Sequence, residues 1–476
     1  MDKRICVESI VKRLIRGGRP VLCMVVCWLA AASTLNAQAA TGFGGPLRVS
    51  NTGRYLTSAD GTPFYYVADT PWTLLSALTL ADAKEYIDIR TGQGFTGLQM
   101  ISTPWSFDNG ADNWNFNGER GKGRNNANGD VPFFTTSGTE PADNGEVSFA
   151  HPNEAYWQHV DAVLNYMEQK GLVAYLIPLW ASNFSSHFTK ADHYTLGKFI
   201  GTRYREQKNV LWVLGGDEQN VSLNKYQDML RGLKDAGVTQ LISMHPRSYR
   251  SSSDHMSTEL DFDSVQIRDS VTKMVALIEE DYNAGNVKPT FLCETWYEDS
   301  VDGGLWSLHK KGGSAAFRAH YWAARLHGGF GEGYGAWVIW LNQFSWREDI
   351  NRAGAVEIAT HMQNILKTVD WHNLAPDDAH AVLSNHSQVH TAFSSESKSA
   401  VAYFEANATV TLRPSVFGGA VKLIWYDPKT GAVKKTETIE GNDVSITTPN
   451  TADSVLVMII SSSSGATIPA SAKPNP

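Results

Sequence analysis

The chain has little cysteine, and most of it lies in a segment that we expect to be removed. There are four cysteines among 476 residues. Three of them precede residue 40, and Cys293 alone follows it. A mature chain with one cysteine has no intramolecular disulfide, which excludes a disulfide-framed fold. Cys293 as a thiol nucleophile is disfavoured, because its strand position points it into the wall of the sheet.

The chain also lacks a surplus of positive charge. Its formal net charge is −8, and the first 39 residues carry six basic against two acidic residues, so the remainder is more acidic still. No basic stripe is left to neutralise phosphates. We therefore expect no nucleic-acid partner.

No apolar run is long enough to cross a bilayer. The best one, Val21 to Ala32, is too short for a membrane span. It follows a basic region and precedes Ala37-Gln38-Ala39, which resembles a cleavage site. Neither Cys23 nor Cys27 follows a small residue, as a lipid-modified cysteine would. Residues 1–39 are therefore predicted to be a signal peptide, and the protein to be exported to the periplasm or beyond the cell without stable membrane insertion.

Strand and helix patterns alternate through residues 40–375. Strands are expected at 64–68, 97–102, 172–179, 210–214, 240–244, 264–267, 289–294 and 336–340. Helices are expected at 81–92, 154–170, 191–207, 223–236, 271–283 and 315–326. Eight strands alternating with helices favour a (β/α)₈ TIM barrel. The alternative is a doubly wound open sheet, which the strand count and the absence of a glycine-rich fingerprint after the first strand disfavour.

The pattern changes after residue 375. Short β-branched strands separated by turns are expected at 389–393, 399–404, 409–412, 421–426, 444–447 and 454–459. Residues 376–465 therefore predict a small all-β sandwich, more often a packing partner for a barrel than an independent binder. Residues 466–476 read as a tail with no core to join.

One connection, residues 105–151, is much longer than ordinary loops. It is too aromatic for a disordered linker, and it follows the second strand, so we interpret it as a wall over a pocket. Asp108, Asp112 and Asp130 in and near it raise calcium as an alternative, but their spacing matches no EF-hand loop. No metal and no cofactor are expected.

Two acidic residues follow predicted strands at the end where barrels build their sites. Asp217 comes after an apolar strand and two glycines, and Glu294 ends the seventh strand. Strands four and seven lie on roughly opposite sides of a barrel mouth, so the two carboxylates can face each other across a substrate bond. The structural alternative for Asp217 is a helix cap. Glu218 and Glu298 are lesser candidates for the two acids.

Other polar and aromatic residues follow strand ends. The chain holds 15 Trp, and flat rings at loop positions are suited to stacking on sugars, although core packing accounts for many. Asp69 either accepts a sugar hydroxyl or bonds a neighbouring loop, and His245 either assists the nucleophile or is structural. The expected substrate-binding residues are Asp69, Trp72, Trp105, Trp180, Asn220, His245, Arg247, Gln266, Tyr297 and Trp340; Trp296 is a further stacking candidate, and Arg268 a weaker polar one.

Several short motifs together resemble the apiosidase-like glycoside hydrolases. They are Asp60-Gly61-Thr62-Pro63-Phe64, Ala68-Asp69-Thr70-Pro71-Trp72, Gly215-Gly216-Asp217, His245-Pro246 with Ser251-Ser252, and Glu294 with Tyr297. The resemblance covers nearly all of the mature chain. It implies a (β/α)₈ enzyme with a trailing β-sandwich, often labelled a collagen-binding domain. By that likeness Asp217 is the general acid/base and Glu294 the nucleophile of a retaining glycosidase. Many members of the wider clan have Asn-Glu where this chain has Gly216-Asp217.

Rival chemistries have less support. His187 and His193 do not have a recognised metal-ligand spacing, and no G-x-S-x-G elbow is present for a serine hydrolase. The alternative from another class is a non-catalytic carbohydrate-binding protein or adhesin on a barrel scaffold. Binding alone would not need both Asp217 and Glu294. The sequence thus predicts a secreted retaining glycoside hydrolase acting on a plant or microbial oligo- or polysaccharide.

Overall fold

The structure is a computed structural model that describes residues 44–104, 124–141, 146–180, 188–217, 223–256, 258–298, 314–337, 339–340, 346–449 and 452–461. The predicted signal peptide, Trp105, Glu218 and Asn220 lie outside these residues. Within them, no helix is both long and apolar enough to cross a membrane.

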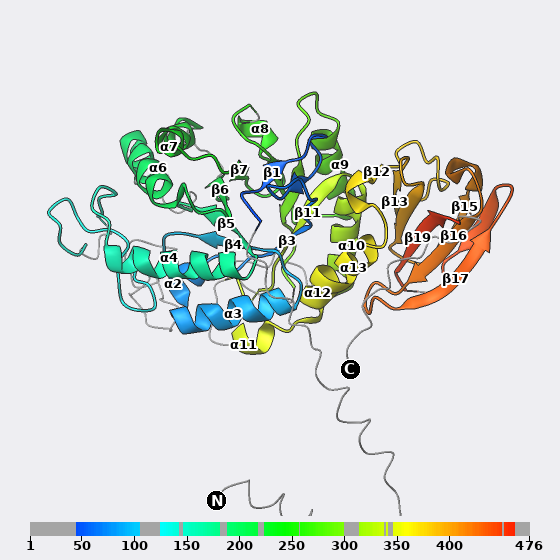
Figure 1. The fold of residues 1–476 in the computed structure, drawn as a ribbon, viewed down its shortest axis with the longest axis horizontal. Helices are drawn as coiled ribbons and strands as arrows, with labels where there is room; N and C mark the ends of the chain where they lie inside the picture. Colours follow the sequence, from blue (N-terminus) through cyan, green and yellow to red (C-terminus); the bar gives the residue numbers. More distant parts are fainter. Residues whose placement is uncertain are drawn as a thin grey trace, which may run out of the picture. The chain divides into compact units, whose positions relative to one another are not determined.

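Eight parallel strands and one short antiparallel strand form the main sheet of the described chain (Figure 1). Its order is β7-β6-β5-β4-β3-β11-β10-β9-β8. The strands are β3 (Tyr66–Asp69), β4 (Gly97–Ile101), β5 (Val173–Ile177), β6 (Val210–Gly215), β7 (Ile242–His245), β8 (Arg250–Ser251), β9 (Asp263–Gln266), β10 (Thr290–Glu294) and β11 (Gly329–Tyr334). A hairpin of β1 (Arg48–Val49) and β2 (Leu56–Thr57) precedes them.

The two ends of the parallel series meet between β7 and β9. The Asp261 backbone donates to the Ile242 carbonyl at 2.8 Å, and the Asp261 carboxylate accepts from the Ile242 amide at 2.8 Å. The Ser243 hydroxyl donates to the Phe262 carbonyl at 2.8 Å and lies 2.9 Å from the Ser264 hydroxyl. One backbone hydrogen bond and several side-chain hydrogen bonds thus join β7 to β9 and to the residues just before it, and the sheet curls into the predicted barrel.

Helices follow the strands along the chain. They are α2 (Leu74–Ala77), α3 (Leu80–Gly92), α4 (Glu154–Gln169), α6 (Lys190–Tyr204), α7 (Leu223–Asp235), α8 (Ser253–Met256), α9 (Val271–Tyr282), α10 (Ser314–Leu326), α11 (Trp346–Asp349), α12 (Ala353–Val356), the π-helix η1 (Glu357–Met362), α13 (Gln363–Leu366) and the short η2 (Trp371–Asn373). Several begin at residues that favour helix starts: Thr189 and Asp192 form a capping box on α6, and Asn153 caps α4.

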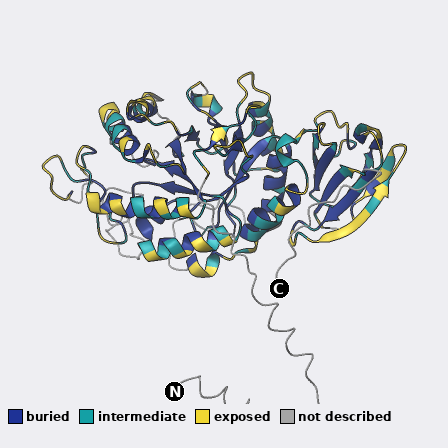
Figure 2. Ribbon diagram, viewed as in Figure 1, coloured by how far each residue is buried: buried dark blue, intermediate teal, exposed yellow. Residues whose placement is uncertain are grey.

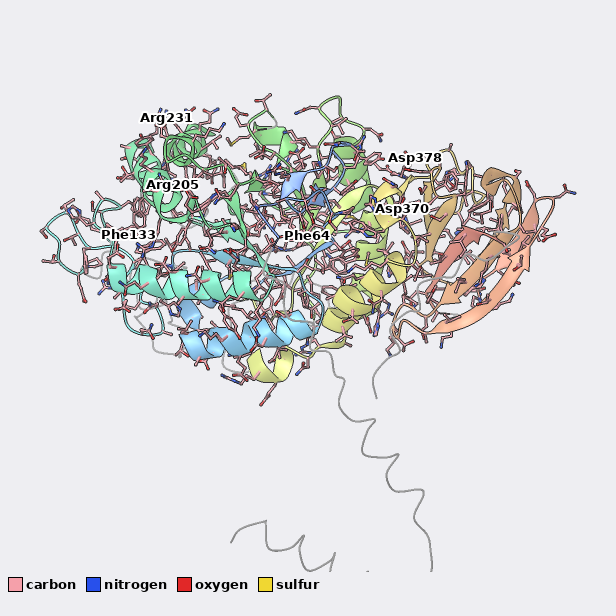
Figure 3. The ribbon with its side chains drawn as sticks, viewed as in Figure 1. Phe64, Phe133, Arg205, Arg231, Asp370 and Asp378 are labelled. Atoms are coloured by element: carbon pink, nitrogen blue, oxygen red, sulfur yellow. The ribbon has the colours of Figure 1, made fainter. Side chains whose placement is uncertain are left out.

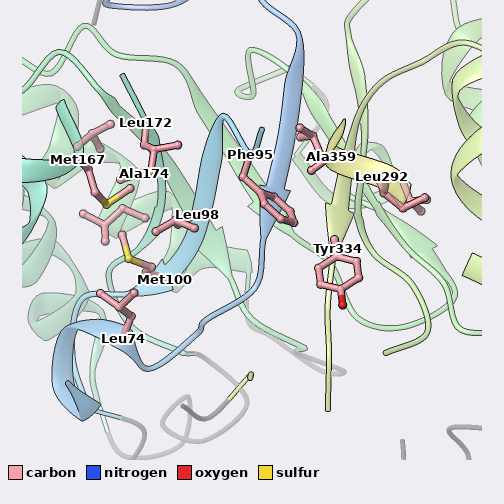
Figure 4. Packing of buried hydrophobic residues seen from close by; sticks show 14 of the residues in the cluster. Leu74, Phe95, Leu98, Met100, Met167, Leu172, Ala174, Leu292, Tyr334 and Ala359 are labelled. Carbon is pink, nitrogen blue, oxygen red and sulfur yellow. The ribbon is translucent and has the colours of Figure 1, made fainter. Parts of the chain in front are cut away.

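Alternate residues of each strand enter two separate cores. In β5, Val173, Tyr175 and Ile177 pack inside the barrel, whereas Ala174 and Leu176 face the helices. Figure 4 shows the outer core, where Met167 of α4 lies with Leu172 and Ala174. Burial on both faces explains why these strands read as continuous apolar runs.

The prediction of a strand at residues 336–340 is wrong. The eighth parallel strand is β11, Gly329–Tyr334, with the sequence GFGEGY. Glycine is disfavoured in strands, so the pattern gave no signal. The close packing explains the composition: a Cβ at Gly333 would lie 2.0 Å from the carbonyl oxygen of Cys293.

The chain after β11 ends in a sandwich, as predicted. One sheet has the order β12-β13-β14-β19-β16-β17, and β15 pairs with β18. The strands are β12 (Ala375–Pro376), β13 (Val389–Ser394), β14 (Ser399–Phe404), β15 (Thr409–Leu412), β16 (Val421–Tyr426), β17 (Val433–Ile439), β18 (Val444–Thr447) and β19 (Ser454–Ile460), with the short helix η3 (Pro414–Phe417) between them. The sequence pattern does not predict β17, an exposed edge strand rich in Lys, Thr and Glu (Figure 2).

The sandwich packs against α10 of the barrel. The rings of Trp322 and Tyr403 stack with centroids 5.9 Å apart and an interplanar angle of 6°. Arg318 of α10 pairs with Asp453 at 2.7 Å and also with Glu357. Buried side chains of β14 and β19 belong to the same apolar core as α10. These contacts are consistent with the prediction that the sandwich is a packing partner of the barrel. The domain limits at residues 39, 375 and 465 stay predictions.

Candidate active site

Asp217 follows a tight turn at the end of β6. Gly215, Gly216 and Asp217 all have positive φ, at 88°, 118° and 53°. A Cβ at Gly215 would lie 2.4 Å from the carbonyl oxygen of His245, so only glycine allows β6 and β7 to approach this closely. The Gly216 amide donates to that same carbonyl at 3.1 Å. The two glycines therefore fix the direction in which Asp217 leaves the strand.

Glu294 enters the site through an irregularity in β10. Leu292 packs in the outer core and Cys293 inside the barrel, so strict alternation would turn Glu294 outward. The pairing of β10 with β9 shifts register between Leu292 and Glu294, and Glu294 lies opposite Gln266. Such a bulge re-aims a side chain.

Asp217, His245 and Glu294 meet at one point. One side-chain ligand atom from each lies within 4.8 Å of the other two. His245 Nε2 is 3.3 Å from Glu294 Oε2, and the guanidinium of Arg268 pairs with Glu294 Oε1. Glu294 is 2% exposed. A buried carboxylate is thus held between a cation and an imidazole, facing a second carboxylate.

The charge state of His245 depends on these neighbours. Burial lowers the pKa of His245, whereas the Cys293 sulfur and the Asp217 carboxylate raise it, and the net pKa shift is upward. A protonated His245 places a positive charge 3.3 Å from Glu294 Oε2 and attracts that carboxylate.

The same three residues have the composition of a metal site. The guanidinium of Arg268 already pairs with Glu294, however, and its positive charge opposes a cation at this point. The arrangement is better suited to proton transfer and nucleophilic attack on a bond held between the carboxyl groups.

Aromatic rings surround His245. The ring centroids of Trp72 and Trp180 lie 5.2 and 5.1 Å from that of His245, and the two tryptophans are 5.1 Å apart. The Trp72 indole donates to the Tyr297 hydroxyl at 2.7 Å, and burial raises the pKa of Tyr297 to about 12. Trp72 is 1% and Trp180 2% exposed, so they build the wall of the site, whereas Trp340, near Tyr297, is only partly buried.

Gln266 is a polar side chain inside the barrel mouth. It is fully buried, and its amide oxygen and nitrogen have no hydrogen-bond partner within the described residues. Asp217 Oδ1 is likewise buried without a partner in that part of the chain. Buried polar atoms are rarely left unsatisfied, so these atoms mark a place for a polar ligand. Arg247, two residues beyond β7, is partly exposed.

Two sequence candidates have structural partners. The Asp69 carboxylate accepts from Arg90 Nε at 2.7 Å and from the Tyr86 hydroxyl, and Asp69 has no exposed surface. Both of these bonds reach Oδ2, whereas Asp69 Oδ1 is buried without a hydrogen-bond partner within the described residues, so the contact of Asp69 with a sugar stays a prediction. The Glu298 carboxylate accepts from the Tyr334 hydroxyl at 2.5 Å and the Gly354 amide at 3.1 Å. Glu298 therefore braces β11 and α12.

Arg268, a weaker candidate from the sequence, pairs directly with Glu294. It lies two residues past β9, and the only signal was its place after a strand end. The prediction that Cys293 points into the wall of the sheet is wrong: Cys293 faces the barrel interior, where its thiol donates to the Val265 carbonyl at 3.2 Å. Trp105, Glu218 and Asn220 lie outside the described residues.

Comparisons with known proteins identify a family and a shared fold. The family model described as "Apiosidase-like, catalytic domain" matches residues 50–373. No curated protein matches the chain. A solved structure titled "Glycoside hydrolase" is 20% identical, with a TM-score of 0.72 over 88% of this chain and 98% of that one.

Two further solved structures share the fold. A glycoside hydrolase family 5 protein from Bacteroides vulgatus is 18% identical, with a TM-score of 0.74 over 90% of this chain and 97% of that one. A GH27 β-L-arabinopyranosidase from Geobacillus stearothermophilus is 10% identical, with a TM-score of 0.50 over 84% and 97%. At these identities the likeness establishes the architecture.

Proposed function

The chain belongs to the apiosidase-like family of glycosidases, and from that premise we propose that it is a retaining glycoside hydrolase in which Asp217 is the general acid/base and Glu294 the nucleophile. The main support for this proposal is the short distance between the two carboxyl groups: an oxygen of Asp217 lies within 4.8 Å of an oxygen of Glu294. Retaining glycosidases hold their carboxyl groups about 5–5.5 Å apart, and inverting ones about 6.5–9.5 Å.

In the first step the Asp217 carboxyl donates a proton to the departing glycosidic oxygen while a Glu294 oxygen attacks the anomeric carbon. The bond to the leaving group breaks as the bond to Glu294 forms. In the second step Asp217 takes a proton from water, which attacks the same carbon and releases Glu294. Two inversions give a product with the configuration of the substrate.

Arg268 and His245 position the nucleophile. Arg268 pairs with Glu294 Oε1 and His245 lies 3.3 Å from Oε2, so both oxygens have a fixed neighbour. Restricting a buried carboxylate in this way keeps it in the geometry for attack. Gln266 lies next to Glu294 in the sheet, with its amide free, within the described residues, to bond a sugar hydroxyl.

We propose the substrate to be a side chain of a plant or microbial polysaccharide, with apiose-type furanosides as the first choice. The support is the family and the aromatic wall of Trp72 and Trp180. The leader predicted at residues 1–39 supports export to the compartment where such polymers are met.

The test is a pair of variants on a series of aryl glycosides with different leaving groups. Asp217→Ala should lower kcat about 10²–10⁴-fold for poor leaving groups and much less for activated ones, which depart without a proton. Glu294→Ala should abolish turnover of both. Asp254→Asn, an exposed acid on α8, is the matched control and should retain wild-type activity.

Two outcomes would remove the assignment. Full activity of Glu294→Ala would exclude the nucleophile, and an equal loss for good and poor leaving groups in Asp217→Ala would exclude the acid. A folded wild type that binds oligosaccharides yet hydrolyses none of them would favour the carbohydrate-binding alternative.

A further inference from the structure

A second group of potential ligands lies away from the active site, where α9 and α10 face the segment that leads into the sandwich. Glu279 is on α9, His327 directly follows α10, and Asp378 follows β12. One side-chain ligand atom from each lies within 4.8 Å of the other two. The three line a pocket of about 390 Å³, and Figure 3 labels Asp378.

The turn that presents Asp378 is fixed. The Asp377 carboxylate accepts from the amides of Ala381 and Val382 at 2.8 and 2.9 Å, and the Asp377 amide donates to the Thr391 carbonyl at 2.9 Å. Because Asp377 is engaged by the backbone, it shapes the turn while Asp378 faces His327.

His327 also belongs to a chain of four side chains. Its Nδ1 is 2.6 Å from Glu279 Oε1, and its Nε2 is 3.0 Å from Nδ1 of His390 on β13. His390 Nε2 is 2.9 Å from Glu405 Oε1. Three hydrogen bonds need three protons, but two neutral imidazoles carry only two between them. With both carboxylates ionised, the chain is one positive charge short.

Either a third proton or a metal cation at the Glu279 end completes this chain. If a metal replaces the proton between Glu279 and His327 Nδ1, then His327 Nε2–H donates to His390, and His390 Nε2–H donates to Glu405. Two protons now serve two hydrogen bonds. A metal-bound histidine whose other nitrogen donates into such a network is the usual arrangement, since the network fixes the ring and its tautomer.

We propose that Glu279, His327 and Asp378 bind one divalent cation of the zinc type, which ties the barrel to the segment entering the sandwich. One imidazole nitrogen and two carboxylates suit Zn²⁺, whereas Ca²⁺ and Mg²⁺ take oxygen ligands. The ligands of tetrahedral zinc stand about 3.3 Å apart at bond lengths of about 2.0 Å, so the 2.6 Å contact opens slightly on binding. Water completes the coordination. The site is structural, and the proposed hydrolysis needs no cation there.

The test uses the full mature chain after treatment with a chelator. Titration with Zn²⁺ should give one site by calorimetry, and Zn²⁺ at about 100 times its Kd should raise the Tm by about 2–5 °C. Asp378→Asn and Glu279→Gln should each weaken zinc binding at least tenfold. The matched control is Glu280→Gln, the exposed neighbour of Glu279 on α9, which should bind as the wild type does.

Each other outcome would overturn the proposal. Absence of zinc binding would mean that a proton completes the chain, and binding unchanged in Asp378→Asn would place zinc elsewhere, for example at Asp217, His245 and Glu294. Glycosidase activity of Asp378→Asn should equal that of the wild type with or without zinc. The cation site and the hydrolase assignment therefore fail separately.

Discussion

Asp281 anchors the segment that follows His245, and its ionisation is costly. The hydroxyls of Ser251 and Ser253 each donate to the Asp281 carboxylate at 2.6 Å. Burial raises the pKa of Asp281 from 3.8 to about 6, although these hydroxyls oppose the pKa shift. An acid with a raised folded pKa binds its proton more tightly when folded, so stability falls as pH rises from 3.8 to about 6 and then stays level.

The size of this effect follows from the shift. A difference of 2.2 units between 3.8 and about 6 corresponds to about 3 kcal/mol at full ionisation. Asp281→Asn removes the charge and keeps an oxygen to accept from the serines. We expect the stability of the variant relative to wild type to increase by about 2 kcal/mol between pH 4 and pH 7.5, because Asp is already partly ionised in the unfolded chain at pH 4.

Urea unfolding at several pH values between these limits measures the difference. Glu280→Gln, an exposed neutralisation on the same helix, is the control and should show no such trend. A stability difference that is flat with pH, or that grows toward acid pH, would show that folding does not raise the pKa of Asp281. Hydrolysis by Asp281→Asn at pH 7.5 should stay close to wild type, since the Asp281 carboxylate bonds Ser251 and Ser253, which have no part in the proposed catalytic steps.

Two further predictions concern packing. Gly215→Ala places a Cβ 2.4 Å from the His245 carbonyl oxygen, so strands β6 and β7 must separate. We expect kcat to fall at least tenfold while circular dichroism shows the fold retained. Wild-type activity would contradict this role for the glycine. Arg318→Met leaves Glu357 and Asp453 without the cation that pairs with them; we expect a loss of about 3–5 kcal/mol in urea unfolding, and a change below 1 kcal/mol would show that the pairs are replaceable.

The barrel was predictable from the sequence because buried parallel strands and amphipathic helices have strong patterns. The apolar run from Val210 to Leu214 predicted β6 to within one residue of its end. It also indicated that Asp217 follows that strand. The eighth strand was not predictable in this way, because close contact with Cys293 demands glycine, which reads as a turn. The edge strand β17 was missed because an exposed strand needs no apolar alternation.

The site was predictable in part, since position after a strand end is visible in the sequence. Which side chains pair is not visible, because it depends on bulges and rotamers. The register shift that brings Glu294 to Arg268 leaves no trace in the residue types. Asp69 shows the same limit: its place at a strand end is visible in the sequence, but the bond from Arg90 of α3 to its Oδ2 is not.

The most direct test of the account is the configuration of the product formed by the two acid variants in the presence of azide. Azide can occupy the place of either missing carboxylate, and NMR identifies the anomer of the glycosyl azide formed from an activated glycoside. With Asp217 as acid/base and Glu294 as nucleophile, we expect a glycosyl azide of retained configuration from Asp217→Ala and of inverted configuration from Glu294→Ala. The same anomer from both variants, or the two results exchanged, would contradict the roles assigned to Asp217 and Glu294.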